Sequence, residues 1–168
     1  KVHDELGRAI HPGMSTWEIN KLGEEMIRSF GCTPNFLNYN GYPASICVSV
    51  NEEVVHGIPS KKRILKEGDI VSLDAGLIYE GYHSDAARTH AVGEISPEAR
   101  KLVEVTRQAF FEGIKYAKAG HHLHEISAAI GAYAESFGYG VVRDLVGHGI
   151  GTHLHEDPAV PNFAQPSR

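Results

Sequence analysis

The sequence predicts an α+β fold, built from helix–helix–strand units that are duplicated around an antiparallel sheet. The first observation behind this prediction is self-similarity at a single fixed offset, the one that separates Glu18 from Glu125, which is typical of a repeated supersecondary unit. The second is a set of segments rich in β-branched or alternating residues that follow the first helices. With 168 residues, 42% of them hydrophobic and 22% charged, the chain has the size and composition of one globular domain.

The repeated unit is clearest at a helix whose two ends are marked. Ser15 and Glu18 form a capping box, an apolar helical stripe follows, and Gly31 provides a left-handed stop. Any two amphipathic helices with glycine stops look alike, but chance does not explain one offset shared by two consecutive helices. Residues Glu5, Gly13, Glu18, Ile19, Ser29, Phe30 and Gly31 recur, all at the same offset, as Glu112, Gly120, Glu125, Ile126, Ser136, Phe137 and Gly138.

The predicted boundary between the two units lies near residue 95. The first unit, about 1–95, continues through strand-like segments at 45–50, 69–75 and 82–92, whereas the second, about 96–168, has room for only the first of these. A sheet without the other strands would leave unpaired edges. We therefore expect a single but incomplete domain whose C-terminal strands are missing, and the absence of a starting Met predicts that the N-terminus is also removed.

Charge and cysteine content exclude several classes of protein. The net charge is −5, and no basic run is longer than Lys61-Lys62-Arg63, so the chain lacks the positive stripe of a nucleic-acid-binding surface. Two cysteines do not form a disulfide framework, which favours a reducing compartment. No apolar run reaches the length of a membrane span. The sequence predicts a cytoplasmic monomer that binds neither nucleic acid nor a membrane.

Two aspartates lie almost symmetrically about a predicted turn near Gly81. Asp74 and Asp85 are expected near-opposite on adjacent antiparallel strands, with Cβ atoms roughly 5 Å apart. In an apolar sheet, two such carboxylates repel each other unless they share a proton or cations lie between them. A pair of metal ions about 3.5 to 4 Å apart fits this gap. A proton-sharing dyad is the other functional interpretation, and a solvated strand edge is the structural one.

A glycine-bracketed histidine provides a third candidate ligand. In the segment GHGIGTHLHEDP, Gly147 and Gly149 would let the backbone around His148 approach a ligand closely. A solvated histidine in a glycine-rich turn is the simpler alternative. Two aspartates and one histidine favour Mn²⁺, Fe²⁺, Co²⁺ or Zn²⁺ over copper. Three ligands do not satisfy two metal ions, so further carboxylates are expected.

Three segments resemble type I methionine aminopeptidases, and the resemblance covers essentially the whole chain. They are NYNGYPASICVSVNEEVVHGIPS, GDIVSLDAGLIYEGYHSDAARTH and GHGIGTHLHEDPAVPNF. The resemblance implies a pita-bread fold and a hydrolase that removes the N-terminal methionine with two divalent metal ions. It further implies that Asp74 chelates one ion, Asp85 bridges both and His148 binds the other. Two glutamates that complete the family's site have no counterpart in this sequence.

The resemblance also implies which residues handle the substrate. His56 matches a histidine that contacts the substrate near the scissile amide, and His155 matches one that helps to stabilise the tetrahedral intermediate. The implied substrates are peptides with an N-terminal methionine, such as nascent chains at the ribosome. The pocket for the methionine side chain would be lined by Phe36, Tyr39, Tyr42, Cys47 and Leu154.

Two other functions share the same residues. An Xaa-Pro aminopeptidase or prolidase would also use Asp74, Asp85 and His148, although it normally carries an extra N-terminal domain. Some pita-bread proteins are non-catalytic binding proteins, but these usually replace the aspartates. Because the two glutamates are absent, an inactive fragment is a further possibility for the chain as given.

Overall fold

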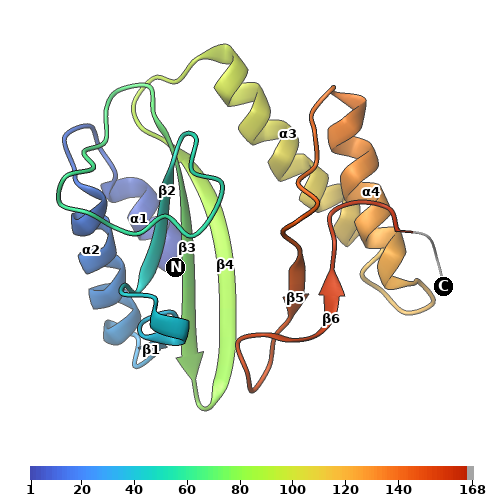
Figure 1. Ribbon diagram of the computed structural model, residues 1–168, viewed down its shortest axis with the longest axis horizontal. Coiled ribbons are helices and arrows are strands. Elements are labelled where there is room, and N and C mark those ends of the chain that lie inside the picture. Colours follow the sequence, from blue (N-terminus) through green and yellow to red (C-terminus); the bar gives the residue numbers. More distant parts are fainter. Residues whose placement is uncertain (166–168) are drawn as a thin grey trace. The chain divides into compact units, whose positions relative to one another are not determined.

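Strand β3 (Ile70–Tyr79) is the centre of a four-stranded antiparallel sheet (Figure 1). One edge of β3 pairs with β2 (Ile46–Val50) and, further along, with the short β1 (Thr33–Pro34). The other edge pairs with β4 (Tyr82–Ala91) along its whole length. The computed structural model describes residues 1–165. The predicted strands are therefore confirmed, with the central strand extended to Tyr79.

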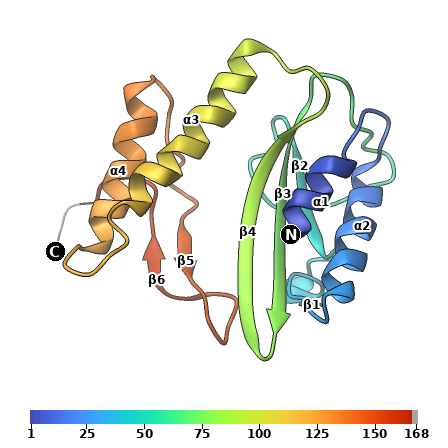
Figure 2. The same ribbon diagram turned by 180° about the vertical axis from the view of Figure 1, so that it is seen from behind.

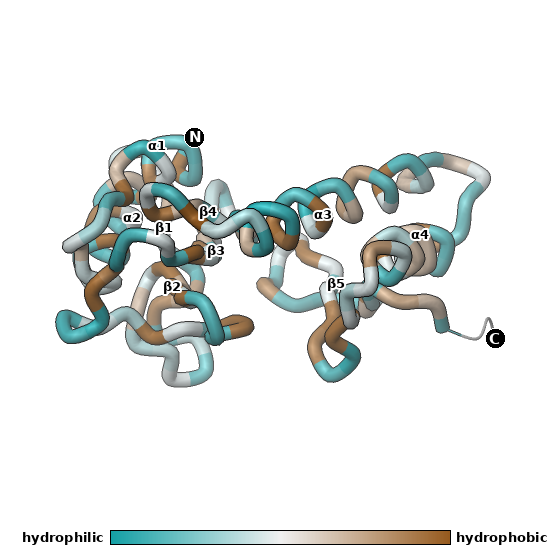
Figure 3. The backbone as a smooth tube through the Cα atoms, turned by 90° about the horizontal axis from the view of Figure 1, so that it is seen from above, coloured by the Kyte–Doolittle hydropathy of each residue, from teal (hydrophilic) through white to brown (hydrophobic). Residues whose placement is uncertain are grey.

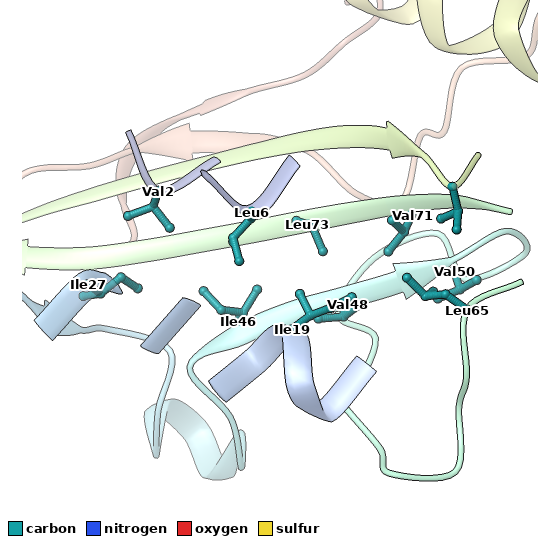
Figure 4. Close-up of a cluster of buried hydrophobic side chains, with 11 residues drawn as sticks. Val2, Leu6, Ile19, Ile27, Ile46, Val48, Val50, Leu65, Val71 and Leu73 are labelled. Carbon is teal, nitrogen blue, oxygen red and sulfur yellow. The ribbon is translucent and has the colours of Figure 1, made fainter. Parts of the chain in front are cut away.

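Two helices, α1 (Val2–Ala9) and α2 (Thr16–Ser29), lie side by side against this sheet (Figures 1 and 2). The predicted capping box starts α2: the Glu18 amide donates to Ser15 Oγ at 3.2 Å, and the Ser15 amide donates to the Glu18 carboxylate at 2.8 Å. Apolar side chains from α1, α2, β2 and β3 fill the space between helices and sheet (Figure 4). They include Leu6, Ile19, Ile27, Ile46, Val48, Val50, Val71 and Leu73.

Burial of these side chains holds the first unit together and gives the sheet two unlike faces. Each fully buried aliphatic side chain contributes about 1.5–3 kcal/mol. Val71 and Leu73 are fully buried in the core. Because successive residues of a strand point to opposite faces, Ser72, Asp74 and Gly76 lie on the face turned away from the helices. The candidate carboxylates are therefore on the polar face of the sheet.

The β3–β4 hairpin corrects the predicted register of the aspartates. Tyr79 pairs with Tyr82 across a two-residue turn in which Glu80 and Gly81 have φ values of 49° and 84°. This is the turn that suits the twist of a hairpin. Asp85 pairs with Gly76, not with Asp74. The near-opposite placement was wrong, because the midpoint of the two aspartates falls one residue before the centre of the turn. They are diagonal neighbours on one face.

The second unit contains α3 (Pro97–Ile114), α4 (Leu123–Ser136) and a hairpin of β5 (Gly147–Gly149) and β6 (Glu156–Val160). It consists of Glu98–Gly149 and the chain from His155 onward, whereas Ile150–Leu154 belongs with the first unit, Lys1–Pro97. Along α3, polar and apolar stretches alternate (Figure 3). Among the residues that the structure describes, no helix is both long and apolar enough to cross a membrane.

Helices α2 and α4 correspond closely across the two units. The first and last residues of α4 both lie at the predicted offset from those of α2. The Glu125 carboxylate accepts the His122 amide at 2.6 Å, as Glu18 accepts the amide of Ser15. The glycines that follow the two helices, Gly31 and Gly138, both have positive φ, at 73° and 82°. This correspondence supports our proposal that the chain contains a duplicated unit.

The contact between the two helices of each unit also corresponds. The large and the small residue of this contact have exchanged places between the first and the second helix. In the first unit, a Cβ added to Gly23 would lie 3.5 Å from Leu6 Cδ1. At the matching positions of the second unit, a Cβ added to Gly113 would lie 2.5 Å from Ile130 Cγ1. Each helix pair thus combines one large side chain with one glycine. A packed core tolerates best those substitutions that conserve its total volume.

Two histidines lie where α1 meets β4, with His3 buried and His90 half-buried. His3 is 7% exposed, and its Nε2 lies 2.7 Å from the Ala86 carbonyl oxygen. The His90 ring lies 6.5 Å from that of His3, measured between centroids. Gly7 leaves room for the His90 ring, because a Cβ there would lie 2.6 Å from His90 Cε1. Burial is the main cause that lowers the pKa of both histidines below the ordinary value of 6.5.

We expect these two histidines to make the chain less stable as the pH falls below about 6.5. In the unfolded state both histidines take up protons near that pH, whereas in the folded state they do so only at lower pH. At these two groups the unfolded state therefore binds more protons in this window, and their contribution to stability rises with pH through it. Arg88 lowers both pKa values further, while Asp4 raises them.

Thermal unfolding at several values between about pH 7.5 and about pH 5 measures this effect. Toward acidic pH, the melting temperature of His90→Leu should fall less than that of the unaltered chain. The substitution removes no hydrogen bond of His90 Nε2, since that buried atom has no partner. The matched control is His124→Leu, which changes an exposed histidine of α4. Equal pH dependence in His90→Leu and the unaltered chain would contradict the prediction.

Candidate active site

Asp74 and Asp85 form a carboxylate pair on the polar face of the sheet. The Asp74 carboxyl group shares a hydrogen bond with Asp85. Burial, and then the hydrogen bond and negative charge of Asp85, raise the pKa of Asp74 to about 8. Asp74 Oδ1 is buried and has no hydrogen-bond partner. A buried carboxylate oxygen without a donor, beside a second carboxylate, is a site where a cation would be stabilised.

The carboxylate pair fits part of a metal site. Carboxylate oxygens are suitable ligands for the divalent ions used in hydrolysis. Within residues 1–165, no group of three or more His, Cys, Asp or Glu side chains is arranged to hold a metal ion. Asp74 and Asp85 therefore have the chemistry of a metal-binding pair, and they do not form a complete site with a third ligand among the described residues.

A small apolar cluster adjoins the carboxylates. Phe36, Cys47 and Leu154 are 8%, 5% and 3% exposed, and the partly buried Tyr42 packs against them. Cys47 of β2 pairs directly with Asp74 of β3, so the two side chains lie next to each other on one face. The structure thus brings together four of the five predicted pocket residues beside the candidate metal ligands.

The fifth predicted pocket residue, Tyr39, lies outside this cluster. It begins the short 3₁₀ helix η1 (Tyr39–Gly41) and is 38% exposed. The Tyr42 amide donates to the Tyr39 carbonyl oxygen at 2.9 Å, which closes this turn. Tyr39 therefore lies close in sequence to the pocket without contributing to its buried part.

Asn35 is a site residue that the sequence did not reveal. Its side-chain amide donates to the carbonyl oxygens of Leu77 and Ser84, at 3.4 and 3.3 Å, and so links β3 to β4 near the carboxylates. A Cβ added to Gly76 would lie 2.0 Å from Asn35 Oδ1 and 2.6 Å from Phe36 Cε1. Gly76 therefore leaves the space in which Asn35 and Phe36 lie over the sheet. No local pattern in the sequence indicates this contact.

The pocket wall is electrically neutral near pH 7. Burial raises the pKa of the Cys47 thiol to about 11, and it also raises the pKa of the Tyr42 hydroxyl. The two groups share a hydrogen bond. The Tyr42 hydroxyl also lies 2.9 Å from the Gly57 carbonyl oxygen, to which it donates. A neutral thiol beside an aromatic ring is a suitable wall for an apolar or sulfur-containing side chain.

His56 lies in the loop that follows β2, in an uncommon backbone conformation. Its φ is 59°, in the left-handed region that residues with a side chain seldom occupy. Such a conformation costs on the order of 1–3 kcal/mol and persists only where the surrounding structure holds it. The next residue, Gly57, is buried against β2. The side chain of His56 is exposed.

His148 and His155 lie together in the second unit. His148 is in β5, and the centroid of its ring is 4.1 Å from that of His155. His148 Nδ1 lies 2.8 Å from the Gly149 carbonyl oxygen. Since a carbonyl only accepts, Nδ1 carries the hydrogen, and Nε2 of the neutral ring carries the lone pair that a metal would use. This hydrogen bond is the kind that orients a ligating histidine.

The glycines around His148 also shape the packing of the β5–β6 hairpin. A Cβ added to Gly149 would lie 2.5 Å from the Asp157 carbonyl oxygen, and one added to Gly147 would lie 3.0 Å from that of Val160. These glycines therefore allow close approach of the β6 backbone. The pairing register shifts between His148 and Gly149, which breaks the regular ladder at the histidine.

The chain is similar to known metallopeptidases along its whole length. The family model described as Metallopeptidase family M24 matches residues 1–168. The chain is 56% identical over 163 residues to a methionine aminopeptidase of Clostridium acetobutylicum, covering 97% of the chain and 65% of that relative. It is 49% identical over 167 residues to methionine aminopeptidase 1 of Bacillus subtilis, covering 99% of the chain and 67% of that relative. The chain thus spans about two thirds of the length of these curated relatives.

Solved structures show the same similarity. A methionine aminopeptidase from Thermotoga maritima matches with a TM-score of 0.96 and 44% identity, over 99% of this chain and 67% of that one. An Xaa-Pro dipeptidase from Bacillus anthracis matches with a TM-score of 0.80 and 31% identity, over 96% of this chain and 44% of that one. The arrangement of helices and sheet is that of the predicted pita-bread fold.

Proposed function

Because the chain belongs to Metallopeptidase family M24, we propose that it carries part of the active site of an aminopeptidase that removes N-terminal methionine. The observation that carries this proposal is the cross-strand pairing of Cys47 with Asp74, which puts a neutral apolar wall beside a carboxylate pair. Hydrolysis of a peptide bond next to a bound apolar side chain needs these two features at adjacent positions. Relatives named methionine aminopeptidase support the same function.

The family uses divalent metal ions, and we propose two of them here, with Co²⁺, Mn²⁺, Fe²⁺ or Zn²⁺ as candidates. Asp74 would bind one ion, Asp85 would bridge both, and His148 would bind the other through Nε2. When bound, the ions would supply Lewis acidity and activate water for attack on the scissile carbonyl group. The unpaired Asp74 Oδ1 and the Nδ1 hydrogen bond of His148 support these assignments.

We propose that two further histidines act on the substrate. His56 would contact the peptide near the scissile amide, and His155 would stabilise the negative charge that develops on the carbonyl oxygen. A donor placed where charge develops lowers the barrier more than one that binds the ground state. The contact between the rings of His155 and His148 supports a place for His155 close to a metal ligand.

The substrate side chain would lie in the pocket of Phe36, Tyr42, Cys47 and Leu154, with Tyr39 at its edge. A thioether gains from contact with aromatic rings, and a neutral thiol does not repel it. Peptides and nascent chains that begin with methionine are the proposed substrates. We further propose that the protein acts in the cytoplasm as a monomer.

The alternative function, cleavage next to proline, has weaker support. The Xaa-Pro dipeptidase relative is 31% identical to this chain, against 44%, 49% and 56% for the methionine aminopeptidases of Thermotoga maritima, Bacillus subtilis and Clostridium acetobutylicum. The M24 fold alone does not separate these activities, because both groups share it. The difference in identity favours the methionine enzyme.

A peptide assay tests the proposed function directly. The full-length gene product, with Mn²⁺ or Co²⁺, is expected to release Met from a Met-Ala peptide at least about tenfold faster than it cleaves an Ala-Pro peptide. Chelation of the metal should remove both activities. The chain of residues 1–168 is assayed beside it for comparison. Any hydrolysis by this shorter chain would come from these residues alone. Preference for Ala-Pro, or hydrolysis that survives chelation, would refute the proposal.

A further inference from the structure

The conformation of His56 requires an explanation from the residues around it. The loop from Asn51 to Pro59 has no regular secondary structure, and His56 has a φ of 59° within it. Histidine enters the left-handed region more readily than most residues, but a free loop would also populate other conformations. Some contact must therefore select this one.

The loop is fastened to the protein at the residue after His56. The Gly57 amide donates to Ser49 Oγ at 3.0 Å. Its carbonyl oxygen accepts from the Val48 amide and from the Tyr42 hydroxyl, both at 2.9 Å. Both polar groups of Gly57 are thus satisfied, and two of the three partners are side chains from outside the loop. We refer to this set of three hydrogen bonds as the Gly57 clamp.

The clamp is buried and tightly fitted. Ser49 is 4% exposed, and the Gly57 backbone is buried as well. A Cβ added to Gly57 would lie 2.3 Å from the Val48 carbonyl oxygen, so the loop contacts the backbone of β2 without an intervening side chain. If the Ser49 hydroxyl were absent, the Gly57 N–H group would be buried without an acceptor, which is costly.

We infer that Ser49 is a positioning residue for His56: its hydroxyl holds the Gly57 amide and thereby keeps His56 in the left-handed conformation. This role rests on the proposed function, in which His56 contacts the substrate. The Tyr42 hydroxyl donates to the carbonyl oxygen of the same glycine, Gly57, and the Tyr42 ring lines the proposed substrate pocket. One hydrogen-bonded unit therefore connects the pocket wall to the backbone next to His56.

Ser72 provides a matched control for Ser49. The two serines are direct cross-strand partners on β2 and β3, on the same face of the sheet. The Ser72 hydroxyl bonds to that of Thr89, at 2.7 Å, and not to the His56 loop. Ser49→Ala and Ser72→Ala therefore remove the same atom from neighbouring positions, and only the first touches the clamp.

Amide exchange and NMR couplings on the metal-free chain test the inference without any enzymatic activity. In Ser49→Ala, the Gly57 amide should exchange at least about tenfold faster, because it has lost its acceptor. The coupling between the amide and α hydrogens of His56 should move from its left-handed value to an average. Ser72→Ala should change neither. Unchanged Gly57 exchange in Ser49→Ala, or an equal change in Ser72→Ala, would overturn the inference.

A second variant covers the case in which Ser49→Ala does not fold. Ser49→Cys keeps the branching of the side chain but replaces the hydroxyl with a larger thiol that is a weak acceptor, so the Gly57 amide should again exchange faster than in Ser72→Ala. If the clamp is intact in Ser49→Cys by both NMR measures, the hydroxyl is not what holds His56, and the inference fails.

Kinetics of the full-length gene product then test whether the position of His56 matters for catalysis. Ser49→Ala should lower kcat about tenfold with little change in KM, because the pocket side chains are retained. Ser72→Ala should keep the activity of the unaltered enzyme. An NMR effect without any change in kcat would overturn the catalytic part of the inference. A gene product that cleaves no methionine peptide would instead refute the proposed function, while the NMR comparison would still measure the clamp.

Discussion

The Asp85→Asn variant of the full-length gene product is expected to lose nearly all peptide hydrolysis, by at least about a thousandfold. An amide has the shape of the carboxylate but lacks its charge, and it cannot bridge two cations through two anionic oxygens. In our proposal Asp85 has this bridging role, so both metal positions would be weakened by one substitution. Turnover of a Met-Ala peptide and calorimetric titration with Mn²⁺ would measure the two effects.

The same variant should remain folded, because the substitution removes a repulsion. Burial is the main cause that raises the pKa of Asp74, and the hydrogen bond and charge of Asp85 raise it further. Without that charge, the pKa of Asp74 should fall, while the effect of burial remains. Loss of activity would therefore not come from unfolding, which circular dichroism can verify. The control is Asp144→Asn, which neutralises an exposed aspartate of the second unit. An Asp85→Asn enzyme with half of the normal turnover would show that Asp85 does not bridge metals.

The second large effect is expected for Gly76→Ala. The new methyl carbon would lie 2.0 Å from Asn35 Oδ1 and 2.6 Å from the Phe36 ring, closer than atoms can approach. Asn35 is held by hydrogen bonds to β3 and β4 and cannot move away without breaking them. Overpacking of this kind costs about 1–3 kcal/mol of folding free energy. Because Phe36 lines the pocket, KM for methionine peptides should also rise, by about tenfold or more.

Urea unfolding of the chain and steady-state kinetics of the full-length gene product would measure the two effects of Gly76→Ala. Gly140→Ala makes the same chemical change at a position where a Cβ meets no atom within 4 Å. It should leave both stability and KM nearly unchanged. If the two variants behave alike, the space left by Gly76 is not required by Asn35 and Phe36.

The helices and strands were predictable because their signals are local. The capping box of α2 depends on Ser15 and Glu18, which are close in the sequence, and both hydrogen bonds are present in the structure. The turn at Glu80 and Gly81 depends on adjacent residues as well. The fixed offset between the two units predicted a second helix pair, and α4 begins and ends at the matching positions. Within each of these elements, neighbours in the sequence are also neighbours in space.

The candidate site was predictable only in part. The candidate ligands Asp74 and Asp85 could be selected because each lies on a strand that can be recognised from its residues. Their diagonal register was not predictable, since a shift of the turn by one residue moves every cross-strand partner. The packing of Gly149 was not predictable either. Its neighbour in space is the backbone of Asp157, and nothing between these residues in the sequence indicates that contact.

By itself, the sequence determined the kinds of element, the family resemblance and the carboxylates on which the proposed chemistry depends. These follow from periodicity, capping residues and short motifs, all of which act over a few residues. Only the tertiary structure decided that Cys47 lies against Asp74, that Asn35 and Phe36 occupy the space at Gly76, and that Ser49 holds the residue next to His56. Such contacts join segments far apart in the chain, and their geometry is set by strand register and packing together.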